Sequence, residues 1–187
     1  ARAGIDATKT GAAMNIDAAE INRTPSVSHS IADMLRMNPQ VRSDNDGAMF
    51  FLGTNNRYNS CQIDGTVSND VFGLASSGTN GGQTGANPIS MDAIQEIQVV
   101  VAPFDVRQSG FTGGGINAIT KQGTNTTKGS AYTYFNNQFM YGKYSAVRDY
   151  AKSELGQQFT RTFGGTLGGA IVKDKLFYFV SAEAQKE

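Results

Sequence analysis

Apolar and polar positions alternate most regularly in the middle of the chain. Residues 97–101 place every second apolar side chain on one face and form a nearly continuous apolar run. Pro103 cannot donate to a sheet ladder and should end this strand. The glycines at 113–115 allow positive φ or a close backbone approach, and residues 116–120 then alternate again. The pattern predicts a strand, a glycine-rich connection and a second strand.

The clearest helical pattern covers residues 28–38. Its apolar side chains fall at i, i+3 and i+4 and form a single stripe that can face a core. Ser30 followed by Asp33 imitates a capping box, which marks the start of the helix. Pro39 ends it, because the residue before a proline disfavours the α region.

Shorter patterns predict further elements in the N-terminal part of the chain. A helical turn that begins near Pro88 can be capped by Ser90. Asn55–Arg57 is interpreted as a hairpin-like connection between two strands. The other expected elements are an edge strand at 10–16, a helical turn at 17–21, a short buried strand at 49–52 and a strand at 58–64.

The longest stretch without periodicity runs from Thr66 to Pro88. Its glycine- and serine-rich centre could act as a flexible linker, but loops of this length inside a compact domain usually bind a ligand or lack order. Val71, Phe72 and Leu74 are expected to be buried. We therefore predict a partly packed loop with a mobile tip.

After Gly123 the chain becomes rich in aromatic side chains with polar interruptions. Three segments, 129–141, 157–171 and 176–184, resemble the strands of about 9–11 residues that cross a membrane obliquely with aromatics at the interfaces. A tight turn is expected at Lys173–Lys175. The alternative interpretation is a β-hairpin extension that never enters a membrane.

Composition narrows the possible functions. The chain has 187 residues with 16 basic and 16 acidic side chains, which gives no support for binding nucleic acid. The single cysteine, Cys61, excludes an internal disulfide and a multi-cysteine zinc site. The lone His29 has no recognisable nucleophile and acid beside it, and no phosphate-binding lysine follows the glycine-rich segment. We expect no catalysis, no bound metal and no cofactor.

Three segments follow one another in an order that is typical of one family. The first is Ser30–Val41, and the second is Arg57–Gly65, a strand that ends in Asp-Gly. The third and most specific is carried by Ile94, Ile97, Val99, Pro103, Val106, Arg107, Gly113, Gly114, Ile116, Asn117, Ile119, Thr120 and Lys121. Together they resemble the plug domain of TonB-dependent outer-membrane receptors, and the Oar-like subgroup most of all. Gln40 and Leu52 depart from the family pattern, which usually has glycine and arginine there.

The resemblance implies an α+β fold, with a small mixed four-stranded sheet and short helices, followed by antiparallel strands that begin a transmembrane β-barrel. It implies a plug at residues 1–125, of which 1–27 is poorly defined, and barrel strands at 126–187. The expected function is gating and substrate recognition in an outer-membrane active transporter that TonB moves by using the proton gradient. A soluble secreted or surface adhesion module is the alternative, and an enzyme ranks third.

The resemblance also implies partners and site residues. The expected partners are TonB (through a TonB box upstream of this chain), outer-membrane lipid, a nutrient ligand of unknown class and, as a further candidate, a lipoprotein lid. Loops at 42–47 and 69–87 correspond to the apical loops that touch substrate. The alternative is that these loops are ordinary solvated turns. A second prediction concerns two residues that would contact the barrel and gate the plug; for these, the alternative is pairing within the plug or plain solvent exposure. The predicted substrate contacts are Asp44, Asn45, Asn69, Asp70 and Phe72, and the predicted plug–barrel gating contacts are Glu96 and Arg107.

Overall fold

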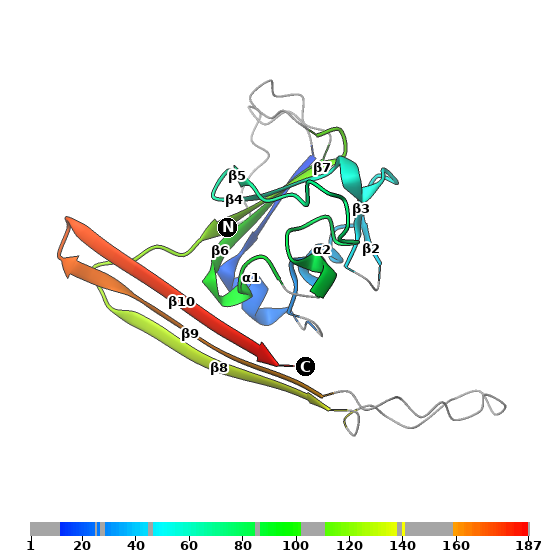
Figure 1. Ribbon diagram of the computed structural model, residues 1–187. Helices are drawn as coiled ribbons and strands as arrows, with labels where there is room; N and C mark the ends of the chain where they lie inside the picture. Colours follow the sequence, from blue (N-terminus) through cyan, green and yellow to red (C-terminus); the bar gives the residue numbers. More distant parts are fainter. Residues whose placement is uncertain are drawn as a thin grey trace. The chain divides into compact units, whose positions relative to one another are not determined.

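The structure is a computed structural model that describes residues 12–24, 26, 29–44, 47–84, 87–101, 111–137, 140 and 159–186 (Figure 1). The chain divides into two compact units, Ala1–Lys121 and Gln122–Glu187. The first unit contains β1 (Ala12–Asp17), α1 (Ala18–Arg23), α2 (Ile31–Leu35), β2 (Val41–Ser43), β3 (Met49–Phe51), η1 (Asn56–Tyr58), β4 (Ser60–Ile63), β5 (Thr66–Val67), η2 (Gly82–Thr84), η3 (Met91–Ala93), β6 (Ile94–Val101) and β7 (Gly114–Thr120). The second contains β8 (Lys128–Asn137), β9 (Phe159–Val172) and β10 (Leu176–Lys186).

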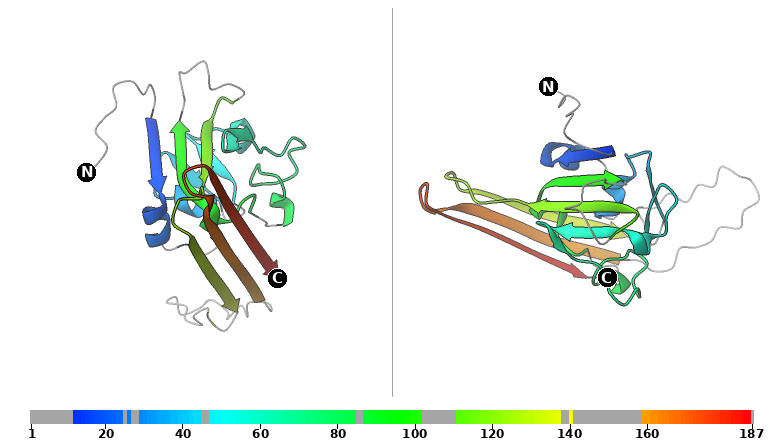
Figure 2. Two further views of the ribbon diagram at one scale, coloured as in Figure 1. Left: turned by 90° about the vertical axis from the view of Figure 1, so that its left-hand side faces the viewer. Right: turned by 90° about the horizontal axis from the view of Figure 1, so that it is seen from above.

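A mixed sheet forms the centre of the first unit (Figure 2). Its five strands lie in the order β1-β6-β7-β4-β5, with β6 antiparallel to both neighbours and β4 parallel to β7. The predicted α+β class is confirmed, and so is the edge strand near the N-terminus. The sheet has five strands instead of four because the two-residue β5 pairs with β4 directly after a tight turn.

The core of the first unit lies on one face of this sheet. Ile97, Val99 and Val101 are buried, as their alternation predicted, and they pack with residues of α2 and of the β2–β3 hairpin. Phe51 is fully buried in this cluster. A Cβ on Gly114 would lie 2.3 Å from the Phe51 ring, so a glycine at the start of β7 is needed for the ring to pack there. The predicted close backbone approach is confirmed at this glycine.

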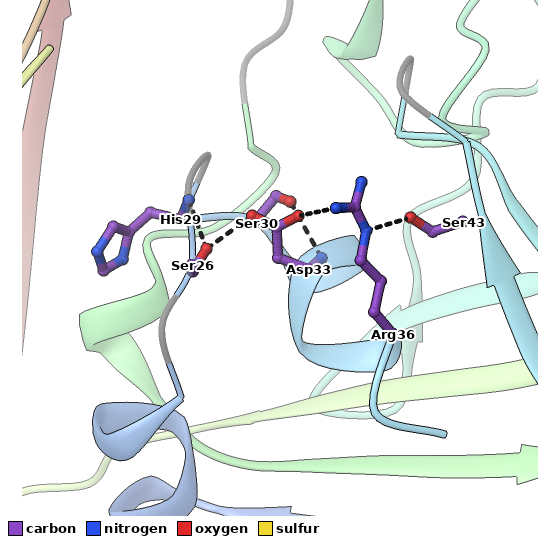
Figure 3. A network of polar contacts seen from close by, with 6 residues as sticks. All are labelled: Ser26, His29, Ser30, Asp33, Arg36 and Ser43. Atoms are coloured by element: carbon purple, nitrogen blue, oxygen red, sulfur yellow. Dashed lines mark hydrogen bonds and ion pairs between the residues drawn. The ribbon is translucent and has the colours of Figure 1, made fainter. Parts of the chain in front are cut away.

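Polar contacts hold α2 in place. The Ser30 hydroxyl accepts the Asp33 amide hydrogen at 3.3 Å and caps the helix, as predicted. The Asp33 carboxylate accepts a hydrogen bond from the Ser26 hydroxyl at 2.7 Å and faces the Arg36 guanidinium at 3.6 Å (Figure 3). Arg36 in turn donates to the Ser43 hydroxyl at 2.9 Å. This network joins the segment before α2 to strand β2.

Three local predictions were wrong. Leu52 is not part of a buried strand: it has a positive φ of 48° and is 63% exposed, in the turn after β3. The Asn55–Arg57 segment does not connect a hairpin, because β3 pairs with β2 while β4 joins the other sheet; the segment starts the 3-10 helix η1. Ser90 does precede a helical turn, but its side chain makes no capping hydrogen bond to η3.

The second unit is a three-stranded antiparallel sheet in the order β10-β9-β8. The three strands overlap the predicted segments, and the turn falls at Lys173–Lys175 between β9 and β10. Asp174 has a positive φ of 62°, and its amide donates to the Asn125 side chain at 2.9 Å, which fixes the turn. Within the described residues, no helix has both the length and the apolarity that a membrane-spanning helix requires.

The register of the second unit gives its sheet two different faces. We call one the polar face, where the Tyr132 hydroxyl donates to Glu183 at 2.6 Å and the Ser130 and Thr166 hydroxyls bond at 2.6 Å. Its residues are Lys128, Ser130, Tyr132, Tyr134, Asn136, Thr160, Thr162, Thr166, Phe177, Phe179, Ser181, Glu183 and Gln185. The other, the apolar face, carries Ala131, Thr133, Phe135, Asn137, Phe159, Arg161, Phe163, Leu167, Ile171, Tyr178, Val180, Ala182, Ala184 and Lys186.

Candidate functional site

The two loops predicted to touch substrate lie next to each other. The first connects β2 to β3, and the Asp44 amide donates to the Ala48 carbonyl at 2.9 Å to close it. A Cβ on Gly47 would lie 3.8 Å from Cβ of Ser77, in the long loop between β5 and η3. Any side chain at position 47 would thus be in ordinary van der Waals contact with Ser77, so the two loops approach each other at this point. Asp44 has an exposed side chain, whereas the predicted contact Asn45 lies outside the described residues.

Asn59 connects both loops to the sheet. Its side-chain amide donates to the Met49 carbonyl at 2.6 Å, and its side-chain oxygen accepts the Gly114 amide hydrogen at 3.2 Å. Its backbone carbonyl accepts a hydrogen bond from the Asn69 side chain at 3.2 Å. A Cβ on Gly113 would lie 2.4 Å from the Asn59 side-chain oxygen, which explains the glycine there. Asn59 belongs to the Arg57–Gly65 motif, but that motif does not predict these hydrogen bonds.

Asn69, a predicted substrate contact, is half-buried and anchors the long loop. Its side-chain oxygen accepts the Cys61 amide hydrogen at 2.7 Å, and an isolated bridge pairs Asn69 with Thr79 across the loop. Both polar groups of its side chain are thus bonded within the first unit. Burial raises the pKa of the neighbouring Cys61 thiol to about 11, so this thiol is protonated and unreactive at neutral pH.

Asp70 closes the turn at the tip of the long loop. Its carboxylate accepts the Ala75 amide hydrogen at 2.6 Å and the Phe72 amide hydrogen at 3.1 Å. These bonds, that of Ala75 above all, hold the pKa of the Asp70 carboxyl below its ordinary value. The Arg57 guanidinium donates to the Gly73 carbonyl at 3.3 Å, and the Asn56 side chain donates to the Ser76 carbonyl.

The apolar side chains of this loop point to solvent, which corrects the prediction that they are buried. Val71, Phe72 and Leu74 are 89%, 85% and 67% exposed. The inner positions are taken by Ala75 and Thr79, both buried. Hydrogen bonds between polar side chains and backbone amides occupy the inner side of the loop, so its apolar side chains lie on the outer, solvent-facing side.

The predicted gating residues are only partly within the described structure. Glu96 lies in β6, half-buried, opposite Asp17 in the register with β1, and the Gln98 side chain donates to its carboxylate at 3.2 Å. The pairing of β6 with β7 is irregular at this point, between Ile94 and Glu96. Arg107 lies outside the described residues. In the part of the chain that the structure describes, no three His, Cys, Asp or Glu side chains gather as a metal site would require.

Two protein families match the chain. Residues 6–116 match the TonB-dependent Receptor Plug Domain family, and residues 119–187 match a family described as an outer membrane beta barrel domain. The first match contains both loops, Asn59 and the five-stranded sheet except for residues 117–120 of β7. The second contains all three strands of the second unit.

The chain is also similar to larger proteins. It is 28% identical over 187 residues to the TonB-dependent transporter Oar of Myxococcus xanthus, covering 94% of this chain and 17% of Oar. The siderophore receptor PirA of Acinetobacter baumannii has a TM-score of 0.67 at 22% identity, covering 95% of this chain and 24% of the receptor. The outer membrane transporter YddB of Escherichia coli has a TM-score of 0.63 at 19% identity, covering 92% and 26%. The chain thus spans about a quarter or less of these proteins.

Proposed function

The chain belongs to the family of TonB-dependent receptors, and from this premise we propose that it is the plug and the first barrel strands of an active outer-membrane transporter. Its location is the outer membrane, since its C-terminal part matches an outer-membrane barrel family. The match to a membrane barrel disfavours the alternative of a soluble adhesion module. A transporter performs no covalent chemistry of its own, so the proposed role needs neither a catalytic residue nor a cofactor.

The proposed division of labour assigns residues 1–125 to the plug and 126–187 to the barrel. The supporting observation for the barrel is the two-faced sheet of the second unit, because barrel strands alternate between lipid-facing and lumen-facing residues. A barrel of about 22 strands leaves a lumen wide enough to need a folded domain as filling. The five-stranded unit with its own core supplies such a domain.

In this role the plug closes the lumen until TonB, driven by the proton gradient, displaces it. TonB is the proposed energy-coupling partner, a nutrient is the proposed ligand, and a lipoprotein lid remains a candidate partner. The bonds of Asn59 suggest how a ligand on the loops could act on the sheet. A displacement of the long loop would strain the bond between Asn69 and Asn59, and Asn59 is bonded in turn to the first residue of β7.

Within the proposed site, the described residues divide into two groups. Phe72, with Val71 and Leu74, is the proposed ligand contact, because these side chains are exposed on a loop whose shape is set by other residues. Asn69 and Asp70 act by holding that loop, since their side chains are bonded to its backbone and to β4. Asp44 and Asn45, from the adjacent loop, remain proposed contacts.

Uptake by cells that carry the intact receptor tests this proposal. A panel of radiolabelled probes would include a ferric catecholate siderophore, cyanocobalamin, a peptide mixture and an oligosaccharide mixture. We expect saturable uptake of one probe class, abolished by a protonophore and by deletion of the receptor gene. Receptor-dependent uptake that persists without a proton gradient, or no receptor-dependent uptake of any class, would refute the assignment.

The same assay tests the role of Phe72. Phe72→Ala should weaken binding of the transported probe by about tenfold to a hundredfold, because burying a phenylalanine against a ligand contributes about 1.5–3 kcal/mol. Val67→Ala is the matched control, since Val67 is also exposed but lies on β5, outside the tip of the loop. Equal affinities for the two variants would remove Phe72 from the site.

We further propose that Glu96 and Arg107 contact opposite charges on the barrel wall and that these contacts are remade when the plug moves. Each contact in such a wet interface contributes about 1 kcal/mol. Glu96→Gln or Arg107→Gln should therefore loosen the closed plug slightly. Entry of a bulky antibiotic into cells measures this, with Asp92→Asn as the control; entry equal to that of the control would argue for pairing within the plug or plain solvent exposure instead.

A further inference from the structure

The apolar face of the second unit carries two positive charges at one place. Arg161 of β9 and Lys186 of β10 are direct partners in the register, so their side chains leave the sheet side by side on the same face. That face contains no aspartate or glutamate among its described residues. The cations on the polar face and in the turn, such as Lys128 and Lys175, lie elsewhere on the sheet.

Two aromatic rings position Arg161. Its guanidinium carbon lies 4.5 Å from the ring centroid of Phe159 and 5.6 Å from that of Phe135. The two rings pack edge to face at 5.4 Å, which makes a small platform under the guanidinium. A guanidinium stacked on an aromatic ring can still donate hydrogen bonds from its N–H groups to another partner. Among the described residues, no carboxylate forms an ion pair with Arg161 or Lys186.

This arrangement is unfavourable unless an anion is present. Like charges directly opposite on neighbouring strands destabilise a sheet. Cations on the lipid-facing side of a barrel strand are also unfavourable, although much less so near the membrane interface. Both difficulties disappear if an anionic group bridges the two side chains, because a phosphate can take two N–H bonds from an arginine and a third from a lysine.

The position of the pair indicates which anion this is. Arg161 and Lys186 lie at the end of the sheet far from the short Lys173–Lys175 turn, near the end of β8 at Asn137 and the start of β9 at Phe159. In outer-membrane barrels short turns face the periplasm and longer connections face outward, with aromatics at both interfaces. The pair therefore lies where the apolar face meets the headgroups of the outer leaflet.

We propose that Arg161 and Lys186, on the Phe135–Phe159 platform, bind a phosphate of an anionic lipid in the outer leaflet. This inference rests on the proposed function, because it takes the apolar face to be the lipid-facing side of a barrel. The guanidinium holds the phosphate in a fixed orientation and the ammonium adds a second charge. The two rings pack against the apolar part of the same lipid.

Native mass spectrometry on the intact receptor tests the proposal, with a bisphosphorylated, acylated diglucosamine lipid as the probe. The double variant Arg161→Gln with Lys186→Gln should bind the probe at least tenfold more weakly than the unchanged receptor. Arg161→Lys should lose less, because it keeps the charge but not the planar fork. Lys128→Gln, a cation removed from the polar face of the same sheet, should change nothing.

The source of the anion is tested with two further probes. The dephosphorylated lipid should bind the unchanged receptor as weakly as the double variant binds the phosphorylated one. Millimolar inorganic phosphate should not displace the lipid, since it cannot use the aromatic platform. Equal binding by the double variant and the unchanged receptor, or an equal loss in Lys128→Gln, would overturn the proposal.

A failure of this inference is distinguishable from a failure of the proposed function. The double variant should still fractionate with the outer membrane and take up the transported probe, because neither residue is among the proposed ligand contacts. If these properties hold while lipid binding is unchanged, the lipid site is wrong and the transporter assignment stands. If the unchanged receptor is absent from the outer membrane, both are wrong.

Discussion

The two units use the same alternation of apolar and polar residues for different purposes. In the first unit the alternating apolar residues of β6, such as Ile97 and Val99, are completely buried under α2 and the β2–β3 hairpin. In the second unit the equivalent positions of β9 remain exposed, with Leu167 at 48% and Ile171 at 65%. Alternation alone therefore says that one face is apolar, and not whether protein or lipid covers it.

The largest expected effect comes from replacing one phenylalanine in each unit and comparing the stability of the first unit. Phe51→Ala removes a fully buried ring and should destabilise the first unit by about 3–5 kcal/mol, because it leaves a cavity in the core. Phe163→Ala, on the exposed apolar face of β9, should leave the stability of the first unit unchanged. Hydrogen exchange of β6 and β7 amides in the intact receptor measures both. Equal protection in the two variants would show that Phe51 is not a core residue.

A second test compares two glycines that each lie against an aromatic ring. A Cβ at Gly114 would lie 2.3 Å from the buried Phe51 ring, and one at Gly164 would lie 2.1 Å from the Tyr132 ring. Gly114→Ala should destabilise the first unit by about 1–3 kcal/mol, because the ring has no space to move. Gly164→Ala should cost less, since Tyr132 is only partly covered and can turn away. Urea unfolding followed by unit-specific hydrogen exchange ranks the two, and the reverse order would contradict the packing described.

The smallest expected effect is a pH dependence of the long loop. The pKa of Asp70 is lowered in the folded protein, so the bonds that its carboxylate makes are fully present above the ordinary carboxyl pKa of about 3.9. They should be lost as the pH falls through the lower, folded value. Protection of the Ala75 amide from hydrogen exchange should decrease only in this acidic range.

The Asp70→Asn variant is the control for this prediction. An amide keeps one acceptor oxygen but has no charge to lose, so exchange of the Ala75 amide should be faster than in the unchanged protein at neutral pH. It should then show no additional acidic transition. An acidic transition of the same size in both proteins would assign it to another carboxylate.

Local rules succeeded where neighbours in sequence decide the conformation. Ser30 marked the start of α2 correctly, because capping acts within a few residues. The helix predicted for residues 28–38 is shorter in the structure: it ends at Leu35, four residues before Pro39, so the proline does not set its end. The same rules failed at Leu52, which looked like the end of an apolar strand but adopts a positive φ in a turn. They also failed for the Asn55–Arg57 segment, because the partner of a strand depends on residues far along the chain.

The candidate site likewise contains some features that the sequence predicted and others that it did not. The positions of both loops were predictable from their composition and from the family motifs, and the structure brings them together at Gly47 and Ser77. The roles inside the long loop were not predictable. Asn69, Asp70 and Phe72 were all predicted to contact substrate, but the side chains of Asn69 and Asp70 hold the loop itself. Phe72, which was also expected to be buried, is exposed.

By itself, the order of residues determined where the longer strands β1, β6, β7, β8, β9 and β10 lie and which family the chain resembles. These properties depend on spacing and on short motifs, and both can be read along the chain. The tertiary structure alone decided that Asn59 joins β3, β7 and the long loop, and that Arg161 and Lys186 stand side by side. Such pairs depend on sheet register and on contacts between distant segments, which no local pattern specifies.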